Sequence, residues 1–171
     1  RIWTVPASGG EPRRLTSQEL PGQEFAPAWS PDGRWIAFTT WEDTVGGHLW
    51  KVRVSGGDPV LLTSEAGEYV HPSWSPDGSE LVLLKGSGAT ERGRTFTHNP
   101  WWDVVRISGD GGPQTRVERV SLPAGMSLSS VARRAIFLEF CILSLFFWLV
   151  LVVPSAAAGK AAIEEIVVTN S

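Results

Sequence analysis

Short runs of β-branched and aromatic residues, separated by turn-forming residues, fill the first part of the chain. Residues 25–29, 35–40, 48–54 and 60–63 are rich in Val, Ile, Phe, Trp and Thr, and Gly, Pro, Asp and Ser bound the runs. Runs of this length and composition are typical of β-strands. The pattern therefore predicts four short strands joined by tight turns.

A turn element with an adjoining tryptophan occurs twice. Residues 26–38 are A-P-A-W-S-P-D-G-R-W-I-A-F and residues 71–83 are H-P-S-W-S-P-D-G-S-E-L-V-L, so Trp29 recurs as Trp74. Proline fixes φ, aspartate can accept bonds from the following amides, and glycine tolerates a left-handed conformation, so each copy reverses the chain. Both tryptophans are expected to pack in the core between repeats, because large aromatic side chains mainly supply buried area. The repeated positions are Trp29, Ser30, Pro31, Asp32, Gly33, Trp74, Ser75, Pro76, Asp77 and Gly78.

A second element repeats with a similar period. Residues 2–16 are I-W-T-V-P-A-S-G-G-E-P-R-R-L-T, residues 49–63 are L-W-K-V-R-V-S-G-G-D-P-V-L-L-T, and a looser copy lies at residues 104–115. Four strands in about 45 residues match one blade of a β-propeller. We therefore predict an all-β fold for residues 1–122, a partial β-propeller of two to three four-stranded blades. Because closed propellers need about four to eight blades, this region is expected to be a fragment.

The two elements resemble the WD40-like propeller repeats of TolB-like proteins. Residues 41–50, 67–74 and 85–102 resemble more narrowly the propeller that precedes the catalytic domain of TolB-like amidohydrolases. The resemblance implies a periplasmic protein whose propeller is non-catalytic. Such a propeller either binds a protein partner or shields the active site of an adjacent metal-dependent hydrolase domain. An alternative is a propeller fragment of a prolyl-oligopeptidase-type peptidase, which would need a G-x-S-x-G motif.

No catalytic residue, metal ligand or cofactor site is predicted in the chain. The three histidines, His48, His71 and His98, form no His-x-His pair, and no G-x-S-x-G motif occurs. Hydrolase activity is therefore not expected of this segment, and the activity of a parent protein stays open. The best candidate for a binding surface in the propeller is the pair Trp101 and Trp102, because adjacent residues of a strand cannot both face one core.

A different kind of sequence follows the propeller repeats. Residues 123–134 are expected to be a linker that ends in the basic pair Arg133 and Arg134, and residues 135–153 form a nearly continuous apolar run. A proline and small residues come next, an order typical of a secretory signal peptide. The alternative is a retained transmembrane helix. In either case one hydrophobic helix over residues 135–153 is expected to enter a membrane.

The tail over residues 154–171 is expected to be extended and flexible. Its end, Ile163–Ser171, is I-E-E-I-V-V-T-N-S and resembles the TonB box of TonB-dependent outer-membrane receptors. The resemblance implies binding of TonB by addition of a strand to the partner's sheet, with Ile163, Val167 and Val168 as candidate contacts. The alternative function that follows is a membrane-associated receptor leader fused to the propeller.

The two resemblances place the propeller on different sides of a membrane. The positive-inside rule puts the residues before Arg133 in the cytoplasm, whereas a TolB-like propeller is expected in the periplasm. Residues 1–125 and 126–171 are therefore hypothesised to come from two adjacent genes. The expected localisation is periplasmic or membrane-associated, in the envelope of a Gram-negative bacterium.

Composition and charge narrow the classes of partner. The chain has 171 residues, 42% hydrophobic and 19% charged, which is typical of a globular protein. Its 15 Lys and Arg are interspersed with 18 Asp and Glu for a net charge of −3, so no nucleic-acid partner is expected. One cysteine excludes an internal disulfide and a cysteine-based zinc site.

Overall fold

A computed structural model describes residues 1–16, 19–86 and 101–121 and the backbone of Glu165–Val168. Every regular element in this part of the chain is a β-strand, which confirms the all-β prediction for the propeller region. The expected linker over residues 123–134 and hydrophobic helix over residues 135–153 lie outside the described residues. Within the described ranges, no helix is long and apolar enough to cross a membrane.

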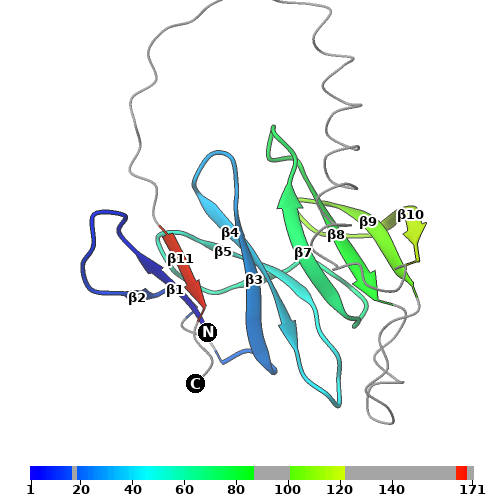
Figure 1. Cartoon of the computed structure of the whole chain (residues 1–171), viewed down its shortest axis with the longest axis horizontal. Coiled ribbons are helices and arrows are strands. Elements are labelled where there is room, and N and C mark those ends of the chain that lie inside the picture. Colours follow the sequence, from blue (N-terminus) through cyan, green and yellow to red (C-terminus); the bar gives the residue numbers. More distant parts are fainter. Residues whose placement is uncertain (17–18, 87–100, 122–164, 169–171) are drawn as a thin grey trace, which may run out of the picture.

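Two four-stranded antiparallel sheets lie side by side (Figure 1). In both sheets each strand pairs with the next one along the chain, as in a propeller blade. The first blade consists of β3 (Gln23–Trp29), β4 (Trp35–Trp41), β5 (Leu49–Arg53) and β6 (Val60–Leu61). The second blade consists of β7 (Tyr69–Trp74), β8 (Glu80–Gly86), β9 (Trp102–Ser108) and β10 (Thr115–Val120). The four strands predicted before residue 64 are confirmed.

A smaller sheet of three strands lies beside the first blade, in the order β11, β1, β2. These strands are β1 (Ile2–Val5), β2 (Arg13–Arg14) and β11 (Glu165–Val168). In the sequence repeat, β1 and β2 correspond to β5 and β6, the last two strands of the first blade. The tail expected to be extended thus contributes a strand to the sheet that contains the first residues of the chain.

The first strand of each blade carries the same irregularity. The pairing register shifts within β3 and within β7. At each shift a non-glycine residue takes a positive φ, 50° at Ala26 and 53° at His71, and Pro27 or Pro72 follows it. Proline has no backbone N–H to donate to the neighbouring strand, so a bulge next to the proline leaves no extra amide donor unpaired. β3 and β7 contact each other where the blades converge.

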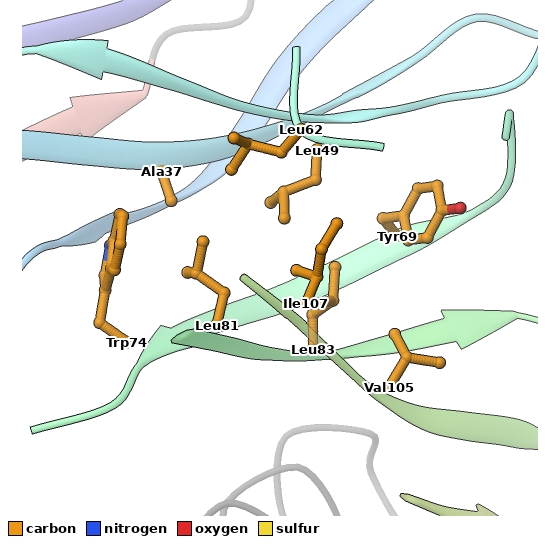
Figure 2. Close-up of a cluster of buried hydrophobic side chains, with 9 residues drawn as sticks. All are labelled: Ala37, Leu49, Leu62, Tyr69, Trp74, Leu81, Leu83, Val105 and Ile107. Carbon is orange, nitrogen blue, oxygen red and sulfur yellow. The ribbon is translucent and has the colours of Figure 1, made fainter. Parts of the chain in front are cut away.

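The main hydrophobic core lies between the two blades (Figure 2). Side chains of β4, β5 and the residue after β6 face side chains of β7, β8 and β9. The cluster comprises Ala37, Leu49, Leu62, Tyr69, Trp74, Leu81, Leu83, Val105 and Ile107. Trp74 also donates its indole N–H to the carbonyl oxygen of Ala28 in the first blade, at 3.2 Å. The repeated tryptophan therefore joins the blades by both packing and a hydrogen bond.

The middle strands of the blades are buried on both faces. In β4, Ile36 and Phe38 belong to a cluster shared with β1, whereas Ala37 belongs to the cluster between the blades. Trp29 is partly buried and packs against the cluster shared with β1. Successive side chains of a strand point to opposite faces. A strand between two packed layers therefore has apolar side chains on both faces, as residues 35–38 of β4 show.

Candidate functional site

The first S-P-D-G turn is held by its own side chains. Asp32 Oδ1 accepts hydrogen bonds from Ser30 Oγ at 2.6 Å and from the Arg34 amide at 3.0 Å. The Ser30 hydroxyl oxygen accepts one from the Trp35 amide at 2.9 Å, which ties the turn to the first residue of β4. Gly33 closes the turn with a φ of 68°, a conformation that glycine adopts without strain.

The second S-P-D-G turn repeats this geometry. Asp77 Oδ1 accepts hydrogen bonds from Ser75 Oγ at 2.6 Å and from the Ser79 amide at 3.1 Å, and Ser75 Oγ accepts one from the Glu80 amide at 3.0 Å. The hydrogen bonds from Ser75 and then from Ser79 lower the pKa of Asp77 to about 2. The pKa of Asp32 is also below its usual value, chiefly because of the matching serine hydroxyl. Both carboxylates are therefore ionised at neutral pH.

A groove of about 370 Å³ opens between the two turns and the connection from β9 to β10, and we call it the turn-face groove. Its residues are Ser30, Asp32, Trp35, Lys51, Trp74, Asp77, Gly78, Ser79, Ser108, Gly109 and Asp110. The side chains of Asp32 and Asp110 are 52% and 96% exposed. Three aspartates and one lysine, Lys51, line the groove, so three negative charges and one positive charge leave its lining with a net charge of −2. Arg34, outside the lining, lies 3.7 Å from Asp32.

Lys51 is a buried cation in the wall of the turn-face groove. Its ammonium group donates to the Gly109 carbonyl at 2.7 Å and to the Asp110 carboxylate at 3.0 Å, and it lies 4.5 Å from the centre of the Trp35 ring. The lysine comes from β5 and both acceptors come from the second blade. These three contacts occupy the ammonium group, so Lys51 serves to join the two blades. The charged groups at the rim that face solvent are the aspartates.

The sequence patterns do not single out Lys51 or Asp110, although one signal was available. Lys51 lies two positions after Leu49 in a strand, so both residues share the face that packs between the blades. A lysine on a core-facing position needs a buried partner. That partner is 59 residues away in the sequence, and the sequence pattern alone does not identify it.

The predicted tryptophan pair is divided between surface and core. Trp102 is only 2% exposed and packs with Val82, Leu84 and Val104. Its side chain therefore packs inside the second blade, and the prediction of a binding surface at this pair rests on Trp101. Trp101 is partly exposed, and the Arg119 guanidinium lies 4.9 Å from the centre of its ring. Neither tryptophan lines the turn-face groove.

The remaining candidate residues do not join this site. The backbones of Val167 and Val168 pair with β1, and Ile163 lies outside the described residues. His48 Nδ1 lies 2.9 Å from Thr63 Oγ1, and burial lowers the pKa of His48. Across the described ranges, no three His, Cys, Asp or Glu side chains are grouped as a metal site requires.

Several curated proteins are similar to parts of this chain, three of which are described here, and no model of a protein family matches it. The uncharacterized peptidase YuxL of Bacillus subtilis is 31% identical over 85 residues, 48% of this chain and 13% of YuxL. Putative tricorn protease homolog 2 of Streptomyces coelicolor is 33% identical over 117 residues, 66% of this chain and 9% of that protein. The Tol-Pal system protein TolB of Alcanivorax borkumensis is 36% identical over 59 residues, 34% of this chain and 14% of TolB.

A solved structure has a similar fold. The structure of putative TolB from Agrobacterium tumefaciens matches with a TM-score of 0.58 and 28% identity, over 70% of this chain and 41% of that one. The chain spans between 9% and 14% of the length of the three curated relatives. None of these four proteins is named as an amidohydrolase or a TonB-dependent receptor. The chain therefore carries a TolB-like β-propeller region, of a kind shared with TolB, a peptidase and a tricorn protease homolog.

Proposed function

We propose that this β-propeller region is a non-catalytic module that binds a protein partner through the turn-face groove. The observation that best supports the proposal is the acidic rim, where Asp32, Asp77 and Asp110 surround one groove built by both blades. Polar groups on loops that a rigid sheet positions are typical of binding sites. The ionisable groups of this groove hold turns or join blades, which suits recognition better than acid–base chemistry.

The charge of the groove favours a basic segment of the partner. Hydrogen bonds keep the pKa of Asp32 and Asp77 below the usual range, so both carry charge at any physiological pH. The Asp110 carboxylate accepts from Lys51 on one side, and its side chain is otherwise exposed, so a cation from a partner can approach it from the solvent. A volume of about 370 Å³ lies at the small end of the range for ligand pockets. We propose that the groove takes a lysine or arginine side chain from an extended segment.

Binding of a fluorescent peptide rich in Lys and Arg, measured by anisotropy, tests this function. Asp110→Asn removes one charge from the rim and leaves both S-P-D-G turns intact, so it should weaken binding by up to about fivefold, the upper end of the range for one exposed ion pair. The matched control is Asp58→Asn, which removes the same charge from an exposed turn outside the groove and should bind as the wild type does.

The salt dependence gives a second measurement on the same proteins. Affinity of the wild type should fall as ionic strength rises, because exposed charges are screened. Equal affinity of the two variants, or no binding of the basic peptide by the wild type at low salt, would contradict the proposed groove.

A second candidate function is to shield an active site on another domain of a longer protein. Two of the relatives are named as an uncharacterized peptidase and a putative tricorn protease homolog, and the chain matches 13% and 9% of their lengths. The narrower resemblance of residues 41–50, 67–74 and 85–102 favours a metal-dependent amidohydrolase as the parent. In a longer protein of either kind, deletion of the propeller should raise hydrolysis of large substrates over small ones. Unchanged size selectivity after the deletion would argue against shielding.

We also propose a location in the cell envelope, which the similarity to TolB supports. Membrane association through residues 135–153 and binding of TonB through Ile163–Ser171 are separate proposals that rest on the sequence. Fractionation of cells tests the envelope location and the membrane association. A pull-down of a Gly159–Ser171 peptide with the periplasmic domain of TonB tests the third, and no binding at high micromolar concentration would count against it.

A further inference from the structure

A second pocket, of about 340 Å³, lies on the second blade, and we call it the ladder pocket. Its charged and amide side chains are those of Glu65, Lys85, Asp103, Gln114 and Arg116. It shares no residue with the turn-face groove. Trp74, the last residue of β7, lines the groove, whereas Tyr69, the first, contacts Gln114 of the ladder pocket. Figure 2 shows these two aromatic side chains at opposite ends of the core, so the two hollows lie at opposite ends of the second blade.

A row of side chains crosses the second blade at the ladder pocket, one from each strand. Lys85 of β8 lies directly opposite Tyr69 of β7 and Asp103 of β9. Asp103 in turn lies directly opposite Arg119 of β10. Directly opposed residues share one face of a sheet, so their side chains interact across the strands. The Lys85 ammonium group lies 5.7 Å from the centre of the Tyr69 ring, and Arg119 donates to both oxygens of the Asp103 carboxylate at 2.7 and 3.0 Å.

All but one of the charged groups of the ladder pocket have a close partner of opposite charge. Lys85 Nζ donates to Glu65 at 3.0 Å, and the hydrogen bonds from Arg119 keep the pKa of Asp103 below its usual value. The exception is Arg116. Its Nη1 lies 4.0 Å from the Asp103 carboxylate, which is too long for a hydrogen bond, and its side chain is 59% exposed. The guanidinium group of Arg116 is therefore open to an anion.

Gln114 supplies a second group that lacks a partner. The Tyr69 hydroxyl donates to the Glu65 carbonyl at 3.0 Å, so its one proton is already used. The Gln114 atom that lies 2.8 Å from this hydroxyl must then be the amide nitrogen, which donates. Oε1 of Gln114 is consequently buried without a hydrogen-bond partner in the part of the chain that the structure describes. Because an unpaired buried acceptor is costly, a ligand that brings a donor is favoured here.

We propose that the ladder pocket binds an α-amino acid as a zwitterion. The fork of N–H donors on Arg116 matches a carboxylate, and the ammonium group of the same ligand supplies the donor for Gln114 Oε1. Val105 and Pro113 also line the pocket and suit a short apolar side chain such as that of leucine. A volume of about 340 Å³ is at the small end for ligand pockets, as a ligand of this size requires.

Titration of the isotope-labelled full chain with three small molecules, followed by NMR, tests the site. The probes are leucine, leucine methyl ester, which lacks the carboxylate, and isocaproate, which lacks the ammonium group. The ester should bind up to about fivefold more weakly than leucine, the effect of one exposed ion pair. Isocaproate should bind about tenfold more weakly, the effect of one hydrogen bond to a buried acceptor. Leucine should shift the side-chain amide signals of Gln114 and leave the backbone signals of Gly109 and Asp110 in the turn-face groove in place.

Two variants and one control assign the groups. Arg116→Gln should weaken leucine binding by up to about fivefold. The matched control, Arg53→Gln, removes the same charge from an exposed side chain outside the pocket and should bind leucine as the wild type does. Gln114→Met keeps the length of the side chain and removes the acceptor, so leucine should then bind no better than isocaproate.

Three results would overturn the proposal. The first is the absence of leucine binding, and the second is equal affinity of the wild type for leucine and either analogue. The third is an equal effect of Arg116→Gln and Arg53→Gln, which would show that leucine meets only the general charge of the protein. The arginine pair decides the question even if Gln114→Met does not fold. Because the ladder pocket and the turn-face groove share no residue, either proposal can fail without the other.

Discussion

Single side chains in the two turns show how a four-residue sequence fixes its own geometry. The carboxylates of Asp32 and Asp77 each accept one hydrogen bond from a serine hydroxyl at 2.6 Å. Each also accepts one from a backbone amide, at 3.0 Å for Asp32 and 3.1 Å for Asp77. All of these groups lie within or directly beside S-P-D-G, so no distant contact is needed to form the turn. The turns were therefore predictable from the sequence, whereas the electrostatic role of their carboxylates at a shared groove was not.

The depressed pKa of Asp77 predicts a loss of stability in acid. The pKa is about 2 in the folded protein and 3.8 in an ordinary aspartate. The ionised carboxylate therefore stabilises the fold above pH 3.8, and this contribution is lost as the pH falls toward 2. Thermal melts between about pH 5 and pH 2 should show a falling melting temperature. Asp77→Asn should reduce this fall, and an identical acid dependence in the variant would contradict the assignment.

At the scale of the strand, the bulges of β3 and β7 store strain where the blades converge. Ala26 and His71 both have φ near 50°, a conformation that costs a non-glycine residue about 1–2 kcal/mol. Each precedes a proline at the same position of the repeat. Because the same strained conformation occurs in both blades, it is a regular feature of the first strand of each blade.

Glycine substitutions in β7 should separate strain from ordinary strand propensity. His71→Gly relieves the positive φ, and the His71 side chain is exposed, so little packing is lost. We expect the free energy of unfolding to rise by about 0.5–1 kcal/mol. The matched control is Ser73→Gly in the same strand without a positive φ, which should lower it by about 0.5–1 kcal/mol. Urea denaturation measures both, and equal effects of the two substitutions would exclude strain at His71.

Strands that depend on local sequence could be predicted, whereas contacts between sheets could not. β3 to β6 follow from local composition and from turns that lie beside them, so their predicted bounds agree with the structure within a few residues. The pairing of β11 with β1 joins the two ends of the chain, and no local pattern specifies it. Lys51 likewise depends on acceptors in another blade. The sequence identified what each blade contains, and the contacts between sheets required the structure.

At the scale of the whole molecule, the two blades are joined by a core, by the hydrogen bond from Trp74 to Ala28 and by the buried cation of Lys51. The core supplies non-directional burial, whereas Lys51 reaches from β5 to Gly109 and Asp110 across the interface. Such a contact fixes how the blades are rotated relative to each other, because a hydrogen bond depends on direction. The turn-face groove depends on this arrangement, since its walls come from both blades.

Removal of the Lys51 ammonium group should therefore destabilise the joined blades. Lys51→Met keeps the apolar stem and leaves the Gly109 carbonyl without its donor, so the free energy of unfolding should fall by about 1–3 kcal/mol. The matched control is Arg53→Met, because Arg53 also lies 4.5 Å from the Trp35 ring but is exposed. It should cost less than about 0.5 kcal/mol. If urea denaturation shows that both substitutions lower the free energy of unfolding equally, the contact with the Trp35 ring, which both side chains make, accounts for the stabilisation instead.

The burial of β4 on both faces has a consequence for how its alignment is specified. If β4 slipped by one position, Ile36 and Phe38 would exchange faces with Ala37, and both faces would stay apolar. Hydropathy therefore does not distinguish the two alignments. Side-chain volume and the hydrogen bonds made by the Trp35 amide and by the hydroxyl groups of Thr39 and Thr40 distinguish them. A single-residue deletion before Trp35 would thus leave the hydropathy profile almost unchanged while moving the Phe38 ring into the place of the Ala37 methyl group.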